Sequence, residues 1–328
     1  MSPATGAVTV GPVVAVLDAA TAREVRAVVA AAAAADGVAP LNEAGLLALA
    51  GPVPGRLHLL ARAPAGGPAL AGAGAVPGGA AAPGPVVGYA GVDTGHSPAA
   101  AELLVAPAAR RAGTGTALAA AVRADPRSAG VGFWAHGDLP PARALARTAG
   151  LSATRRLARM RRPANTPLPA APLAAGVRLA AFRPGTDEDA WLRVNAAAFA
   201  GHPEQGRWTR ADLAVRTAED WFDPAGLLLA WRDDPAGDDP AGGGPRLLGS
   251  HWTKLTDDRE RVGEVYVLGV DPDTQAAGLG TALAVAGLRS LADRGARDVE
   301  LYVEADSRAV ALYRRLGFVD DTLDVVYS

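Results

Sequence analysis

The chain has 328 residues, of which 49% are hydrophobic and 20% are charged, so it carries enough apolar material for two domains and too much for a disordered segment. Its net charge of −2 and isoelectric point near 6.2 argue against a nucleic-acid-binding protein, which needs a basic face. The absence of Cys excludes disulfides, thiolate metal sites and a cysteine nucleophile, and it fits a reducing cytosol.

The N-terminal region shows no targeting segment. Residues 1–26 lack the basic head of a secretory signal, and the apolar run after Arg26 ends at Asp36, which makes it too short to cross a bilayer. We therefore expect a cytoplasmic protein that has neither a nucleic acid nor a membrane as partner. We also expect it to be a monomer.

Proline and glycine divide the chain. The Pro-rich stretch 161–176 has the composition of a semi-rigid linker, and the Gly/Pro/Ala runs at 63–85 and 233–245 are typical of long surface loops. We predict a first domain over residues 1–162, a linker over 163–176 and a second domain over 177–328.

The two halves of the chain are similar in sequence. Residues 101–122 align with 266–287, and residues 144–151 align with 311–318, in both places at an offset close to 165. A nearly constant offset over this length indicates a tandem duplication of one fold.

Each half is predicted to begin with helices and to continue as strand–helix–strand–helix–strand, an α/β fold with a mixed sheet (α+β). In the second half, β-branched and aromatic runs predict strands, a period of 3.6 predicts helices, and Gly317 ends the last helix. The predicted elements are strand 261–270, helix 278–294, strand 298–305, helix 307–317 and strand 318–328.

A glycine loop, VDPDTQAAGLGTAL, joins the first of these strands to the first helix. Gly278 and Gly280 let the backbone approach a ligand closely, and the helix start offers unpaired amides and a partial positive charge, which favours a pyrophosphate. A dinucleotide-binding loop would need glycine at Leu283, and a P-loop would need Gly-Lys-Ser/Thr, so both are excluded. Because strand–glycine–helix turns also occur without a ligand, the loop alone does not establish a site.

Two spaced motifs narrow the choice. Gln-x-x-Gly-x-Gly after a strand ending in Val-Asp-Pro, followed by Ala-x-x-Leu-Tyr-x-x-x-Gly-Phe, resembles the GNAT N-acetyltransferase superfamily. The phrases DGVAPLNEA, FWAHG, ARMRRP, NAAAFAGHPEQG, WFDP, HWTK, GEVYVLGVDP and LYVEAD, in this order, look like the mycothiol synthase family, two-domain GNAT enzymes of actinobacteria. The resemblance covers almost the whole chain apart from the two Gly/Pro loops, and it implies two tandem GNAT acyltransferase domains with acetyl-CoA as co-substrate and no metal.

Acetyl transfer to an amine needs one group that takes a proton from the amine and another that protonates the departing thiolate. Glu264 lies four residues before Leu268 on the strand leading into the loop, so that at a period of two both face one side, and it is the candidate base. Tyr313 is the candidate acid, since a phenol of pKa about 10 is a workable donor to a thiolate. At an offset of 165 the counterpart of Glu264 is Ala99, and the alignment of 144–151 with 311–318 makes Ala146 the counterpart of Tyr313. The first half has therefore kept the glycine loop and lost both proton carriers. A solvated strand carboxylate and a core tyrosine are the alternatives for these two residues.

The resemblance implies the same base and acid, and it makes the C-terminal domain the catalytic one. The acceptor that it implies is the cysteinyl amine of a Cys–glucosamine–inositol pseudodisaccharide, a small molecule whose acetylation gives mycothiol. The matching acceptor-binding residues are Glu43, Glu204, Lys254, Glu264 and Tyr302. The matching acetyl-CoA residues of the second half are Leu268, Gly269, Val270, Gln275, Ala276, Ala277, Gly278, Leu279, Gly280, Thr281, Asp306, Ser307 and Arg308. Those of the first half are Leu103, Leu104, Val105, Arg111, Ala112, Gly113, Thr114, Gly115 and Thr116.

Two positions in this pattern stand out. Lys254 is the single Lys in a chain with 31 Arg, which indicates that an ammonium is needed there rather than any cation. Asp306 stands where the superfamily usually has Asn, and the segment is one residue shorter than the pattern, which leaves the CoA contacts of Asp306, Ser307 and Arg308 open.

Other classes of function stay open at this point. One is a non-catalytic acetyl-CoA binder, which the first half alone would fit, and another is a GNAT N-acetyltransferase for a different small amine or for a protein N-terminus. A metal site is not predicted, because the five histidines are scattered without an i, i+4 pair. They are His58, His96, His136, His202 and His251.

Overall fold

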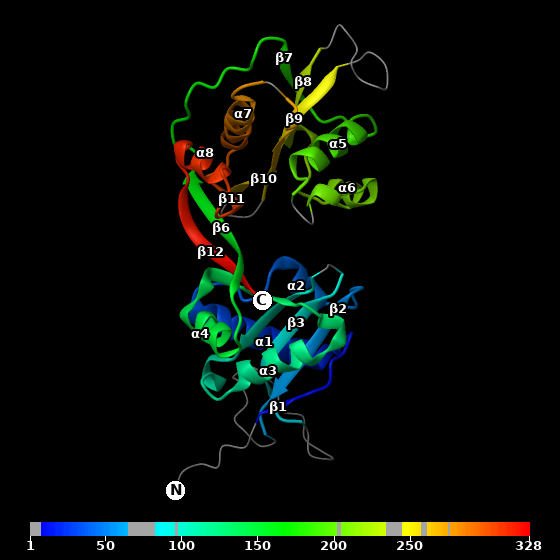
Figure 1. Ribbon diagram of the computed structural model, residues 1–328, viewed down its shortest axis with the longest axis vertical. Helices are drawn as coiled ribbons and strands as arrows, with labels where there is room; N and C mark the ends of the chain where they lie inside the picture. Colours follow the sequence, from blue (N-terminus) through cyan, green and yellow to red (C-terminus); the bar gives the residue numbers. More distant parts are fainter. Residues whose placement is uncertain are drawn as a thin grey trace. The chain divides into compact units, whose positions relative to one another are not determined.

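The computed structural model describes residues 8–64, 83–95, 98–201, 205–233, 245–256, 261–274 and 276–328 (Figure 1). The chain divides into two compact units, Met1–Leu157 with Leu323–Ser328, and Ala158–Thr322. The last six residues thus belong to the first unit, a return that no single boundary in the sequence describes. Most of the two predicted Gly/Pro loops lies outside the described residues. The Pro-rich stretch has no helix or strand between Ala164 and Gly176.

The first unit contains a mixed sheet of order β1-β2-β3-β4-β5-β12, in which β4 and β5 are parallel and the other neighbours are antiparallel. The strands are β1 (Thr9–Val10), β2 (Arg56–Arg62), β3 (Val86–Asp93), β4 (Ala100–Val105), β5 (Gly132–Ala135) and the last residues of β12 (Val319–Tyr327). The helices are α1 (Ala19–Asp36), α2 (Glu43–Ala48), α3 (Thr114–Ala124) and α4 (Pro140–Thr148), with short 3-10 turns η1 (Pro107–Ala109), η2 (Pro126–Ser128) and η3 (His136–Asp138).

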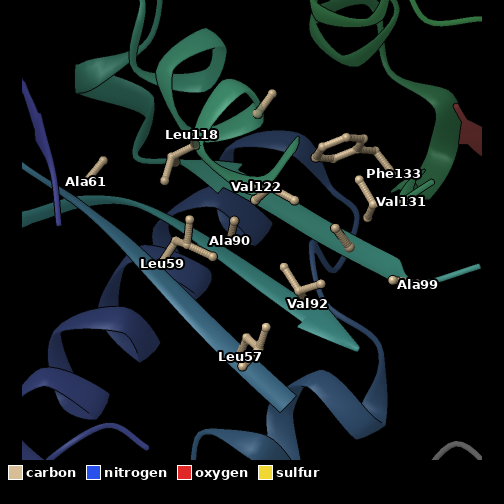
Figure 2. Close-up of a cluster of buried hydrophobic side chains, with 12 residues drawn as sticks. Leu57, Leu59, Ala61, Ala90, Val92, Ala99, Leu118, Val122, Val131 and Phe133 are labelled. Carbon is tan, nitrogen blue, oxygen red and sulfur yellow. The ribbon is translucent and has the colours of Figure 1, made fainter. Parts of the chain in front are cut away.

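Helices cover both faces of this sheet. Figure 2 shows the core on the α3 side, where Leu118 and Val122 of α3 meet Leu59 of β2, Val92 of β3 and Phe133 of β5. The opposite face packs on α1 through a second cluster, formed by Val25, Val28, Tyr89 and Leu104 with their neighbours. The alternation of buried positions along each strand therefore places consecutive side chains in two different cores.

The second unit repeats this plan with the strand order β11-β10-β9-β8-β7, and β6 lies beside β11. Only β10 and β11 are parallel among the pairs β7–β8, β8–β9, β9–β10 and β10–β11. The strands are β6 (Ala153–Pro163), β7 (Val177–Ala181), β8 (Leu227–Arg232), β9 (Arg246–Leu255), β10 (Val262–Val270) and β11 (Asp298–Glu304). The helices are α5 (Glu188–Ala198), α6 (Arg210–Thr217), α7 (Leu279–Asp293) and α8 (Ala309–Arg315), with turns η4 (Gln205–Arg207) and η5 (Pro224–Gly226).

The two faces of the second sheet differ in character. An aromatic cluster that includes Trp191, Trp252, Phe222 and Tyr266 fills the side of α5, and an aliphatic cluster of Leu248, Leu279 and Leu283 with their neighbours fills the side of α7. The strands and helices predicted for the second half are present within about two residues of their predicted ends. No helix in the described ranges is long and apolar enough to cross a membrane.

Candidate functional site

The site is built where two parallel strands separate. The register of β10 with β11 runs from Val262 opposite Asp298 to Val265 opposite Leu301 and goes no further. On its other edge β10 stays paired with β9 as far as Val270. Beyond the separation, the N–H and C=O groups on the β11 side of Leu268–Val270 are therefore open to an extended ligand that pairs like a strand.

A β-bulge interrupts β10 just before this opening. The register with β9 shifts between Val265 and Val267, so Tyr266 is an extra residue. The expectation that Glu264 and Leu268 face one side is therefore wrong. Gly263, next to Glu264, lies against Leu291 of α7, so Glu264 faces away from α7, whereas Leu268 packs in the cluster on the α7 side. The inserted residue reverses the alternation that a period of two assumes.

Three of the predicted acceptor residues share one face of the second sheet. Glu264 is directly opposite Lys254 on β9 and Glu300 on β11, and residues directly opposite one another point to the same face. Tyr302 follows Glu300 by two residues on the same face, with 45% of its surface exposed. Burial and the Glu300 charge raise the pKa of Tyr302, against a hydrogen bond from Arg159 that lowers it.

Glu300 and Arg159 were not foreseen from the sequence. The alternation of Glu300 with Tyr302 along one strand was the available signal for Glu300. Arg159, on β6, pairs with Asp321 at 2.6 Å and has no local motif that marks it. Of the other predicted acceptor residues, Glu204 lies outside the described residues. Glu43 opens α2 in the first unit, and its side chain is also outside the description.

The predicted glycine loop leads into α7 as expected. Gly278 occupies the N-cap with a φ of 79°, a left-handed conformation that favours glycine, and no side chain caps the helix. A Cβ on Gly280 would meet only Val270 Cγ2, at 3.8 Å, so the space beside the first turn is open. Leu279 is buried in the core and Ala276 packs against it, so they would meet a ligand through their backbone. Gln275 lies outside the described residues, and the uncapped amides suit an anion.

Tyr313 lies on α8 and is buried, with its ring edge-on to Phe318 at 5.7 Å between centroids. Burial raises the pKa of its phenol to about 12, so the group keeps its proton at neutral pH. Before α8, Ser307 donates its backbone N–H to Glu304 and accepts from Ala309 through its hydroxyl, which orders the turn that carries Asp306 and Arg308.

The first unit repeats the separation of strands and the uncapped helix. β4 pairs with β5 only as far as Glu102 opposite Trp134, and α3 starts from Gly113 with a φ of 81°. A cavity of about 770 Å³ follows, bounded on another side by α4. The predicted first-half acetyl-CoA residues that line it are Leu103, Leu104, Val105, Arg111, Gly113, Thr114, Gly115 and Thr116. Ala112 does not line it.

The strand registers correct one predicted counterpart. No bulge interrupts β4, whose pairing with β3 is continuous, so Glu264 corresponds to Ala100 rather than to Ala99. By the same registers Asp93 takes the place of Lys254, and Gly132 that of Glu300. An offset counted along the chain misses this because the second half has one extra residue in the strand.

The counterpart of Tyr313 is Ala146, as predicted. Both helices end at a glycine with positive φ, Gly150 at 69° and Gly317 at 87°. In each, the residue after that glycine donates its N–H to the matched position, to Ala146 O at 2.9 Å and to Tyr313 O at 3.0 Å.

A partly buried charged network occupies the end of β5 in the first unit. His136 Nε2 lies 2.7 Å from Glu102 Oε1, and His136 Nδ1 lies 3.0 Å from Asp324 Oδ2. The backbone N–H of Gly137 also donates to Asp324, and that of Asn42 to Glu102. Although burial opposes protonation, the two carboxylates raise the pKa of His136 to about 9. The imidazole is therefore charged at neutral pH and fixes the end of β12.

The other described histidines belong to the cores. His58 lies 2.7 Å from the hydroxyl of Tyr89, and burial lowers its pKa. His251 bonds the carbonyl of Leu283, and burial lowers its pKa to about 4. His96 and His202 are outside the described residues, and within those residues no group of three His, Cys, Asp or Glu could hold a metal ion.

Known proteins resemble this chain at two levels. Residues 191–318 match the Acetyltransferase (GNAT) family. Mycothiol acetyltransferases of Thermobispora bispora and Salinispora arenicola are each 48% identical, over 92% and 91% of this chain and 94% and 90% of their own lengths. The mycothiol acetyltransferase of Nocardia farcinica is 46% identical over 95% of both chains.

Two solved structures share the fold over nearly the whole length. A GCN5-related N-acetyltransferase from Sphaerobacter thermophilus superposes with a TM-score of 0.69 at 23% identity, covering 96% of this chain and 94% of its own. A tandem GNAT protein from the clavulanic acid biosynthesis pathway superposes with a TM-score of 0.62 at 21% identity, covering 98% and 97%. These likenesses confirm the predicted fold of two tandem acyltransferase domains.

Proposed function

We propose, from the premise that the chain belongs to the mycothiol acetyltransferase family of GNAT enzymes, that its second unit acetylates the cysteinyl amine of a Cys–glucosamine–inositol pseudodisaccharide and so forms mycothiol. Acetyl transfer is the activity of the family, and GNAT acetyltransferases use acetyl-CoA as donor. The assignments of the base, the acid and the ligand contacts belong to the same proposal.

One observation carries the proposal: Lys254, Glu264 and Tyr302 share a face beside the open edge of β10. An ammonium, a carboxylate and a phenol together supply donors and acceptors for the hydroxyl groups of a sugar. The carboxylate of Glu264, with Glu300 directly opposite it, also attracts an acceptor whose amine is a cation. The acceptor therefore lies on the side of Glu264, while acetyl-CoA approaches along Leu268–Val270.

The proton steps follow from ordinary acidities. An α-amine has a pKa of about 7.7–8.0, so only about a tenth of it is neutral at neutral pH, and Glu264 takes its proton directly or through one water. The amine nitrogen then forms a bond to the thioester carbon, and the carbonyl oxygen gains charge that strand amides beyond the bulge stabilise. As the C–S bond breaks, its electron pair goes to sulfur, and Tyr313 gives that sulfur a proton. The bonded nitrogen loses its second proton to solvent, which in turn returns a proton to Tyr313.

We also assign acetyl-CoA contacts in both units. In the second, the pantetheine arm pairs with Leu268–Val270, and the pyrophosphate meets the loop from Gln275 to Thr281, with Asp306–Arg308 nearby. In the first, the cavity beside Gly113 accepts a second acetyl-CoA through the matching residues. The first unit does not turn it over, because alanines stand in place of Glu264 and Tyr313.

A panel of acceptors tests the assignment of substrate. The purified protein is supplied with acetyl-CoA and with the Cys–glucosamine–inositol acceptor, free cysteine, an aminoglycoside or a peptide with a free N-terminus. Because the first two acceptors carry a thiol, an assay for the thiol of released CoA would detect them too. The products are therefore quantified by mass spectrometry. We expect kcat/KM for the pseudodisaccharide to exceed that for each other amine by at least about 100-fold, since remote sugar contacts contribute to transition-state binding. A faster reaction with any of the others would overturn the substrate assignment.

A further inference from the structure

Lys254 and Glu264 form an unusual cross-strand pair. They are directly opposite one another on β9 and β10, an arrangement that ordinarily favours an ion pair. An ammonium bound to the carboxylate would lower its affinity for a proton and so weaken a base. Among the ion pairs of the described residues, however, none joins Lys254 to Glu264, and Glu264 interacts elsewhere.

The ammonium of Lys254 lies instead over an aromatic ring. Its Nζ is 4.9 Å from the centre of Trp221, within the range in which the negative face of an indole attracts a cation. Trp221 belongs to the segment between α6 and β8, which is far from β9 and β10 in the sequence. The indole therefore reaches the site only through the tertiary fold.

The ring of Trp221 is held independently of the lysine. It packs edge-on against Tyr266, the bulge residue, at 5.0 Å, and lies 5.9 Å from Trp252. The segment itself is fixed by a hydrogen bond from Phe222 N to Glu219 O of 2.9 Å and by an ion pair of 3.2 Å between Asp223 and Arg294. Because the ring is fixed, it restricts the ammonium at the end of the flexible four-carbon lysine side chain to one position.

We propose that Trp221 is a positioning residue for acetyl transfer: its ring holds the Lys254 ammonium apart from Glu264 and presents the remaining N–H donors to hydroxyl groups of the acceptor. The inference rests on the proposed function, in which Lys254 binds the acceptor and Glu264 is the base. It adds a residue that touches neither acetyl-CoA nor the reacting atoms and acts through Lys254.

Steady-state kinetics of Trp221→Leu, Lys254→Gln and the double variant test this coupling. We expect Trp221→Leu to raise the acceptor KM about 3- to 30-fold, the range of a cation–π contact, while the KM for acetyl-CoA stays within twofold. In the double variant the acceptor KM should equal that of Lys254→Gln alone, because the tryptophan then has no cation to position. Trp221→Phe, which keeps an aromatic face and disturbs packing less, should show the same coupling at reduced size.

Trp208 provides a matched control. It belongs to the same aromatic cluster and carries its own cation, Arg216, at 3.9 Å from the ring centre. Trp208→Leu should lower the melting temperature without changing the acceptor KM, and its effects should be independent of Lys254→Gln.

The outcomes separate the two proposals. If Lys254→Gln leaves the acceptor KM unchanged, Lys254 does not bind the acceptor, and the inference about Trp221 is overturned as well. If Lys254→Gln raises the acceptor KM but neither Trp221 variant does, or if their effects multiply in the double variant, the inference alone is overturned. Equal effects of Trp208→Leu and Trp221→Leu would likewise reduce Trp221 to a packing role.

Discussion

The two units of this protein share the same backbone arrangement at the glycine loop and differ in the side chains that surround it. Each has a parallel strand pair that separates and a helix that starts from a left-handed glycine, Gly113 at φ 81° and Gly278 at φ 79°. Only the second has the row Lys254–Glu264–Glu300 beside the opening, where the first has Asp93, Ala100 and Gly132. An open strand edge and an uncapped helix are thus present in both units, whereas side chains that could carry a proton stand beside the opening only in the second.

A single inserted residue shifts the match between the two units but not the face of the matched position. With the bulge at Tyr266, Glu264 corresponds to Ala100. Ala100 lies between two residues that pack on the α3 side, so it faces away from α3 as Glu264 faces away from α7, and the units differ there by a carboxylate against a methyl group. The first unit uses the matching region for stability instead. Glu102 lies where the second unit has Val267, and its carboxylate joins His136 and Asp324 in a partly buried network.

The largest expected effect comes from the base. Glu264→Gln should lower the rate at neutral pH by about 100- to 10,000-fold, the usual contribution of general base catalysis, and should recover in part at high pH where the amine loses its proton unaided. The pH dependence of kcat measured by product mass checks both points. Ala100→Glu, the matched change in the first unit, should leave the rate unchanged, and an unaltered rate in Glu264→Gln would remove this residue as the base.

The next effect distinguishes the two glycine loops. Gly280→Val fills the space beside the first turn of α7, where the chain itself offers only an ordinary contact to Val270, so folding should survive. Acetyl-CoA turnover should fall on the order of 1,000-fold, because at least two hydrogen bonds from backbone N–H groups to a charged pyrophosphate are lost. Gly115→Val should spare turnover and reduce the bound acetyl-CoA from two equivalents to one by calorimetry. Equal losses of turnover from both changes would mean that both units catalyse.

A smaller effect is expected at the lone lysine. Lys254→Arg replaces a compact ammonium by a planar fork and should raise the acceptor KM about 10- to 150-fold, the loss of one hydrogen bond to a charged group, while acetyl-CoA binding stays unchanged. Its counterpart Asp93 pairs with Arg56 at 3.0 Å, and Asp93→Asn should change stability but no kinetic constant. If the acceptor KM and kcat stay within twofold of the wild-type values, Lys254 is an ordinary surface residue that does not bind the acceptor.

The smallest expected effect is on stability: loss of the His136 charge should change the free energy of unfolding and not the rate of turnover. The pKa of His136 is raised to about 9 in the folded protein, so its contribution is complete below the unfolded pKa and is lost as pH rises through the folded value. Between about pH 6 and pH 9.5 the wild type should lose up to about 3 kcal/mol more stability than His136→Gln, as measured by urea unfolding. Parallel pH profiles of the two proteins would contradict the charged network.

Much of this architecture follows from local sequence. The glycines at 278 and 317 act through backbone conformations that favour glycine, and the alternation in 262–270 and 298–304 is a property of single strands. The duplication by itself predicts both glycine loops. Cytoplasmic location and a monomeric state stay predictions from the sequence alone.

The remaining features were decided by contacts between segments far apart in the chain. His136 and Asp324 are 188 residues apart, and no local signal marks them as partners. A bulge adds one residue without a sequence signature, so the face of Glu264 and the match to Ala100 depended on the register of the whole sheet. Trp221 meets Lys254 only because the segment after α6 folds over β9. Local propensities set which elements form, but register and long-range packing set which side chains meet, because those depend on every strand at once.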